Sequence, residues 1–204
     1  MKHPQTSSSL ISLLILLASY TAFAGHGFMS AFGNVEWLSK PGRTPDSAWY
    51  HLDTWYEEGQ LWLAEMPQEK FQLSLAFAGE KLAEAESMLN VQNTAAAQIA
   101  TDQYWSYIDR AEQVEMSQGN VELVERLATA LLEHQYILTI IYTELPELPL
   151  ESRSVLREVF TIAQKRYATI ANRLPRKKRG ALFFKEEEVR WSIEMAIRTD
   201  EERK

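Results

Sequence analysis

Apolar side chains recur at intervals of three and four residues from about residue 45 to residue 174. Between Pro67 and Leu89 the intervals are 4-3-4-3-4, and they place six residues on one stripe: Phe71, Leu75, Ala78, Leu82, Ala85 and Leu89. This spacing is that of an amphipathic α-helix with one buried face. Alternating apolar and polar runs, which are typical of strands, are few. We therefore expect an all-α protein.

The same rhythm and its interruptions predict five long helices with short connections. Gly119-Asn120, Pro146 and Pro149 interrupt the pattern, because glycine and proline end helices readily. Asp46 or Ser47 is available to cap the first helix. The sequence thus predicts an antiparallel bundle, followed by a C-terminal helix at about 185–202. The bundle helices are expected at about 45–65, 67–89, 94–117, 121–145 and 152–174.

The first 24 residues resemble a secretory signal peptide. Lys2 precedes a short apolar run, Leu10 to Ala18, and Ala22-Phe23-Ala24 forms an A-x-A end. The run is shorter than the roughly 20 residues of a membrane span. We expect cleavage after Ala24 and a periplasmic or secreted protein with no stable membrane span. An uncleaved signal anchor is the alternative.

Three further regions follow the predicted signal peptide. Residues 25–44 are rich in Gly, Ser and aromatic residues and predict an irregular arm, whereas 45–174 form the predicted bundle domain. Residues 175–204 are expected to form a basic linker and a charged helix. The basic run at 176–179 is expected to be solvated, although it could instead contact anionic lipids or cell-wall polymers.

Charge and cysteine content exclude several classes of function. The chain has 28 acidic and 21 basic residues, a net charge of −7, which argues against nucleic acid as a partner. It has no cysteine. A disulfide framework, a thiol nucleophile, a thiolate metal site and a lipidated cysteine are therefore excluded.

The segment 45–89 carries a resemblance to a known family. Its most telling part is the run from Leu75 to Glu86, in which Ala78, Lys81, Leu82 and Glu84 match an A-x-x-(R/K)-L-x-E pattern. The segment resembles the domain-of-unknown-function 5667 family of secreted or membrane-tethered bacterial proteins. Asp53 and Ser74 depart from the basic residue and the histidine common there. The resemblance implies an extracytoplasmic helical fold and no catalytic residue. Its other matching residues are Pro45, Ser47, Tyr50, Leu52, Glu57, Pro67, Glu69 and Lys70.

Candidate metal and catalytic residues are sparse. His134 falls within an apolar stripe, and its neighbours at three and four positions are all apolar, which favours a core histidine over a ligand. Cleavage after Ala24 would leave Gly25-His26 at the N-terminus, an end that can chelate Cu(II). His26 or His134, or His51, together with carboxylates, is the alternative metal site.

Acidic pairs such as Glu57-Glu58 and Glu84/Glu86 are expected to be solvated surface, because catalysis needs carboxylates in contrasting environments. Glu-x-x-His, H-E-x-x-H, G-x-S-x-G and phosphate-binding glycine loops do not occur. We predict no catalytic residue, no cofactor and no metal, and hence a protein that is not an enzyme.

Aromatic residues crowd the arm and the first helix. The candidate binding residues are the tryptophans of this cluster: Trp37, Trp49, Trp55 and Trp62. They could be buried by the arm, since aromatic rings supply packing area, or exposed as a patch for a partner. The leading prediction is a non-enzymatic helical protein that acts through protein–protein contacts, as a chaperone or envelope-stress adaptor, with a homo-oligomer possible. A metal- or small-ligand-binding bundle is the alternative.

Overall fold

The computed structural model of the chain describes residues 30–32, 40–144 and 148–202. The chain divides into two compact units, Met1–Gly33 and Asn34–Lys204. In the first unit the described residues form a turn, in which the Phe32 amide donates to Ser30 Oγ at 3.1 Å. The predicted signal peptide and most of the predicted arm lie outside the described residues.

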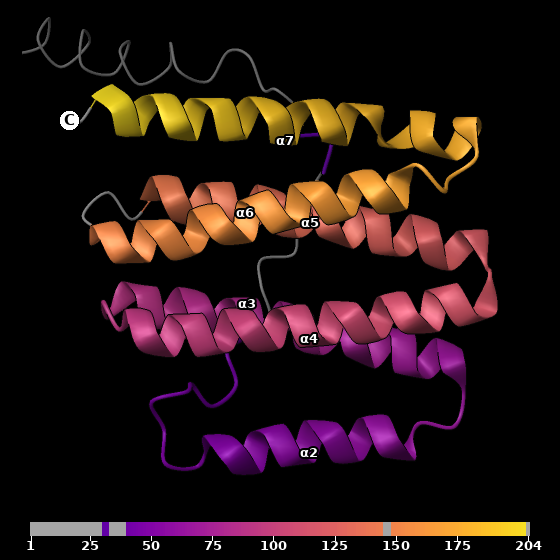
Figure 1. Ribbon diagram of the computed structural model, residues 1–204, viewed down its shortest axis with the longest axis horizontal. Coiled ribbons are helices and arrows are strands. Elements are labelled where there is room, and N and C mark those ends of the chain that lie inside the picture. The colour runs from indigo at the N-terminus through magenta and orange to yellow at the C-terminus, as the bar shows by residue number, and fades with distance from the viewer. Residues whose placement is uncertain (1–29, 33–39, 145–147, 203–204) are drawn as a thin grey trace, which may run out of the picture. The chain divides into compact units, whose positions relative to one another are not determined.

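The second unit is all-helical in its described part, as the sequence predicts (Figure 1). Helices that follow one another run antiparallel. α3 packs along α4, and α5 packs against both α6 and α7, while α2 lies beside α3. The helices are α2 (Tyr50–Leu63), α3 (Pro67–Asn90), α4 (Thr94–Gln118), α5 (Val121–Glu144), α6 (Leu150–Ala171) and α7 (Arg176–Glu202).

Local sequence explains three of the helix ends. Pro67 occupies the first turn of α3, where its missing N–H leaves no hydrogen bond unmade. The Asn93 side chain caps α4 by accepting from the Ala96 amide at 3.2 Å. Gly119 ends α4 with φ of 59°, a left-handed conformation that glycine adopts without strain.

The predicted cap of the first helix is wrong. α2 begins at Tyr50 with Trp49 as its N-cap, rather than at Asp46 or Ser47. The Ser47 hydroxyl accepts from the Trp49 amide and the Asp46 carboxylate accepts from the Thr44 hydroxyl, so both side chains stabilise a turn that precedes the helix.

Nearly all the predicted stripe residues form the core between the helices. Leu75 and Val114 are half-buried, and Leu145 lies outside the described residues. The buried stripe residues outside α3 are Ala100, Tyr104, Tyr107, Ala111, Val124, Leu127, Leu131, His134, Leu138, Ile141, Leu156, Phe160, Ala163, Tyr167, Ile170 and Leu174.

The predicted basic linker is also wrong, because residues 176–179 form the first turn of α7. The Arg179 amide donates to the Pro175 carbonyl, and Lys178 pairs with Glu125 of α5. Lys185 Nζ also lies 3.1 Å from Glu133 Oε1 of α5. The C-terminal helix therefore packs on the bundle from its first turn. None of the helices in the described part has the length and apolar character that a membrane crossing requires.

Candidate functional site

α2 has two faces of different chemistry. Its inner face buries Tyr50, Glu57 and Leu61 against the rest of the unit. Its outer face carries apolar side chains that are largely exposed. At 100° per residue, these outer positions fall within an arc of about 140°. We call this surface the α2 aromatic face: Trp49, Leu52, Trp55, Tyr56, Trp62 and Leu63.

The exposure of this face is large for side chains of its type. Trp49, Trp55 and Trp62 are 61%, 70% and 81% exposed, and Tyr56 is 68% exposed. Scattered apolar residues on a surface are ordinary, whereas a contiguous apolar patch marks an interaction site. Three of the four tryptophans singled out in the sequence thus lie on one exposed surface. The fourth, Trp37, lies outside the described residues.

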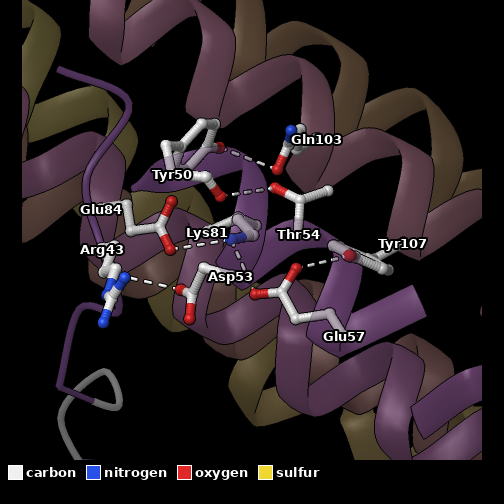
Figure 2. Close-up of polar contacts among 9 residues, drawn as sticks. All are labelled: Arg43, Tyr50, Asp53, Thr54, Glu57, Lys81, Glu84, Gln103 and Tyr107. Atoms are coloured by element: carbon white, nitrogen blue, oxygen red, sulfur yellow. Dashed lines mark hydrogen bonds and ion pairs between the residues drawn. The ribbon is translucent and has the colours of Figure 1, made fainter. Parts of the chain in front are cut away.

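Beneath this face, an ion-paired cluster fastens α2 to α3 and α4 (Figure 2). Lys81 of α3 is fully buried, and its Nζ lies 2.7 Å from Glu57 Oε1 of α2 and 2.8 Å from Glu84 Oε1 of α3. The same Nζ lies 5.2 Å from the centre of the Tyr50 ring. The Tyr107 hydroxyl of α4 donates to Glu57 Oε2 at 2.6 Å. We call these five residues, Tyr50, Glu57, Lys81, Glu84 and Tyr107, the Lys81 cluster.

A second layer of carboxylates extends the Lys81 cluster toward the chain segment that precedes α2. Asp53 Oδ2 accepts from the Arg43 amide at 3.1 Å. A Cβ on Gly42 would collide with a Glu80 carboxylate oxygen and would lie 2.7 Å from Asp53 Oδ2. Glycine at position 42 therefore allows the backbone to pass directly over the two carboxylates.

Burial and crowding of negative charge set the protonation of this region. Burial raises the pKa of Glu84 to about 7, against the lowering effect of the Lys81 ammonium, and the charge of Glu57 raises it further. Burial, then the charge of Glu57, also raises the pKa of Glu80. Burial lowers the pKa of Lys81, but hydrogen bonds to Glu57 and Glu84 outweigh this effect and raise it. The ammonium is therefore charged at neutral pH.

The region that contains this site also matches a known sequence family. The sequence model of the family described as "Domain of unknown function (DUF5667)" matches residues 42–148, just over half of the 204 residues. The chain belongs to the DUF5667 family. The matched region begins at Gly42 and includes the α2 aromatic face and the whole Lys81 cluster. The resemblance over residues 45–89 is thus confirmed. No curated protein and no solved structure shows significant similarity to the chain.

The expectation that acidic pairs in this DUF5667 chain are solvated is wrong for Glu57 and Glu84, which are 3% and 0% exposed. α3 has a second buried stripe beside the predicted one, and Lys81 and Glu84 belong to it. Its spacing of 3-4-3-4 was visible in the sequence, and the apolar members Phe77 and Met88 were the available signal. The members of this second stripe are Ser74, Phe77, Lys81, Glu84 and Met88.

Three carboxylates of the DUF5667 region could hold a metal ion. Asp53, Glu57 and Glu80 each offer an oxygen, and these oxygens all lie within 4.8 Å of one another. Oxygen ligands of this kind suit hard divalent cations such as Ca²⁺. The cation that the structure places against Glu57 is the ammonium of Lys81.

His134, the histidine considered as a metal ligand, is buried between α5 and α4. Its Nδ1 lies 3.2 Å from the Tyr104 hydroxyl, and the two rings meet edge to face. Burial lowers the pKa of His134 to about 4, so the imidazole is neutral near pH 7. His51 is exposed on α2, and His26 lies outside the described residues.

Two features outside the predicted site were missed from the sequence. α7 exposes three aromatic side chains, Phe183, Phe184 and Trp191. A cleft of about 340 Å³ lies between α5, α6 and α7, with Tyr142, Phe160 and Ile193 among its lining residues. This volume is at the lower end of the range of small-molecule pockets, roughly 300–1,000 Å³. If the DUF5667 protein binds a small ligand, as the alternative prediction has it, this cleft is the candidate site.

Proposed function

We propose that this DUF5667 protein is a non-enzymatic periplasmic or secreted protein that acts through protein–protein contacts made by the α2 aromatic face. The observation that carries the proposal is the exposure of six apolar side chains on one side of a single helix. Aromatic residues dominate the energetics of protein interfaces, and tryptophan and tyrosine are enriched among the residues that contribute most. The cellular location rests on the predicted signal peptide at residues 1–24.

The Lys81 cluster supports this role, because a binding surface is more effective when it is held rigidly. Ion pairs and hydrogen bonds on the inner face of α2 connect it to α3 and α4. Tyr50 adds a hydrogen bond from its hydroxyl to Gln103 Oε1 of α4 at 2.8 Å. Polar contacts therefore anchor the inner face, and the apolar outer face remains available for binding.

We further propose that the partner is an apolar segment of an unfolded client, so that the protein is chaperone-like. In the test, aggregation of reduced insulin is followed by light scattering with and without the purified protein. At several-fold molar excess, the wild type should suppress aggregation, and the variant Trp55→Ser/Tyr56→Ser/Trp62→Ser should lose most of this effect. The chain offers a matched control, Trp191→Ser on α7, because Trp191 is 62% exposed and lies on another helix.

Two results would contradict the proposal. Absence of suppression by the wild type at several-fold excess would exclude the chaperone-like role. Equal suppression by the α2 variant and the wild type would show that another surface binds clients. Far-UV circular dichroism of each variant checks that the helices are intact.

A further inference from the structure

We infer that the α2 aromatic face also binds the same face of a second copy of the chain, with the two α2 helices antiparallel and crossing at Gly59. This inference rests on the proposed function, since it takes the same surface as a protein-contact site. It adds a specific partner and a specific arrangement. In the free protein, clients would then compete with the second copy for the face.

The size of the face suits a dimer. Taking about 200 Å² for an aromatic side chain, the exposed fractions of the three tryptophans and Tyr56 correspond to roughly 550 Å². Leu52 and Leu63 bring the apolar area to roughly 700 Å², which approaches the ~800 Å² that each partner buries in a stable interface. The largest apolar patch on a typical monomer is about 300–600 Å².

The order of residues along α2 makes the face complementary to itself. Apolar positions of the helix lie symmetrically about Gly59: Tyr56 and Trp62 are three residues away, and Trp55 and Leu63 are four residues away. In an antiparallel pair related by a two-fold axis at Gly59, each residue meets its counterpart from the other copy. The expected contacts are Tyr56 with Trp62 and Trp55 with Leu63.

Gly59 provides the crossing point. It lies at the middle of the apolar arc, and a Cβ at this position would have nothing within 4 Å. The absence of a side chain lets a second helix approach closely, nearer than the usual 8–10 Å between helix axes. The large rings on either side of Gly59 then pack around the crossing.

The charges of α2 do not oppose this pairing, because each acidic side chain of the helix has a partner in its own chain. Asp53 accepts from the Arg43 amide, and Glu57 pairs with Lys81 on the inner face. Glu58, which is next to the crossing, lies 2.6 Å from an Arg110 guanidinium nitrogen. The two helices therefore approach without bringing unpaired carboxylates together.

The test uses residues 25–204 of the chain, at tens of micromolar, in sedimentation equilibrium. The wild type should have twice the monomer mass. Gly59→Glu should shift it to the monomer mass with unchanged circular dichroism, because the substituted position faces open space. Gly180→Glu on α7 is the matched control, since a Cβ on Gly180 would also have nothing within 4 Å; it should remain dimeric.

The absence of cysteine in the chain allows a direct test of the register. Gly59→Cys should form a disulfide with its own counterpart across the two-fold axis under mild oxidation. Leu52→Cys alone should stay largely uncrosslinked, whereas Trp55→Cys/Leu63→Cys should give a crosslinked dimer. These three results together distinguish antiparallel crossing at Gly59 from other contacts.

Several outcomes would overturn the inference. A wild type that is monomeric at 100 μM, or a dimer that persists in Gly59→Glu, contradicts it. A parallel arrangement would instead crosslink Leu52→Cys with itself. If the protein is monomeric and still suppresses client aggregation through α2, only the dimer is refuted. If the α2 substitutions change neither mass nor client aggregation, the proposed function is refuted as well.

Discussion

Replacement of Lys81 by methionine tests whether the Lys81 cluster holds α2 in place. Methionine approximates the length and volume of the lysine side chain but removes its charge and its hydrogen bonds. Glu57 and Glu84, which are 3% and 0% exposed, would then lose the ammonium that lies 2.7 and 2.8 Å from their oxygens. Removal of one partner from a buried ion pair destabilises a protein by about 3–5 kcal/mol.

That magnitude is large for a domain of this size, since total free energies of unfolding are about 5–15 kcal/mol. We therefore expect Lys81→Met to lower the free energy of unfolding by about 3–5 kcal/mol and Tm by roughly 10 °C. Urea denaturation at pH 7.5, followed by far-UV circular dichroism, measures the first quantity. Tryptophan fluorescence reports on α2 in the same samples, because Trp49, Trp55 and Trp62 lie on or next to this helix.

Two further variants make the result interpretable. Lys178→Met removes a partly exposed ion pair with Glu125, for which we expect a loss below about 1 kcal/mol. The triple variant Lys81→Met/Glu57→Gln/Glu84→Gln removes all three charges and should recover at least half of the lost stability. A loss below about 1 kcal/mol in Lys81→Met, equal to that in Lys178→Met, would refute the reasoning.

Two pH-dependent predictions concern buried titratable groups. Because the Glu84 pKa is raised from 4.5 to about 7, the folded state keeps a proton that the unfolded state loses in this pH range. The free energy of unfolding should therefore fall by about 3 kcal/mol as pH rises from 4.5 to 7. The urea midpoints of Glu84→Gln should not show this fall. The same dependence of the urea midpoint on pH in Glu84→Gln and in the wild type would contradict this prediction. His134, with its pKa lowered from 6.5 to about 4, should show a constant imidazole NMR shift between pH 8 and pH 5, and a midpoint above pH 6 would be contrary evidence. Its effect on stability has the opposite sign, with stability lost as pH falls below 6.5, so Glu84→Gln is compared with the wild type at each pH.

The bundle helices could be predicted because their signals are local. Pro67 and the apolar stripe of α3 indicated the helix and one buried face without knowledge of any neighbour. The start of α2 and the helical state of residues 176–179 were harder to predict. At the start of α2, Asp46 and Ser47 stabilise a preceding turn instead of capping the helix. At residues 176–179 the helix meets a distant element, because Lys178 pairs with Glu125 of α5.

The candidate site could be predicted only in part. Crowding of tryptophans drew attention to Trp49, Trp55 and Trp62, but sequence reasoning left open whether they were buried or exposed. The Lys81 cluster was missed, because a lysine and two glutamates on helices are ordinarily solvated. The burial of Lys81 on α3 depends on Glu57 of α2, which pairs with it, and on Tyr107 of α4, whose hydroxyl donates to Glu57.

The sequence by itself determined the helical class, most helix boundaries and the family, because helical periodicity, breaks and motifs are properties of neighbouring residues. The tertiary structure alone decided which face of α2 is exposed and which charges are buried. The physical reason is that burial of an ionic group is tolerated only where other elements supply its counter-charge and hydrogen bonds. Those partners are 24 to 50 residues away along the chain, and only the packing of α2, α3 and α4 brings them together.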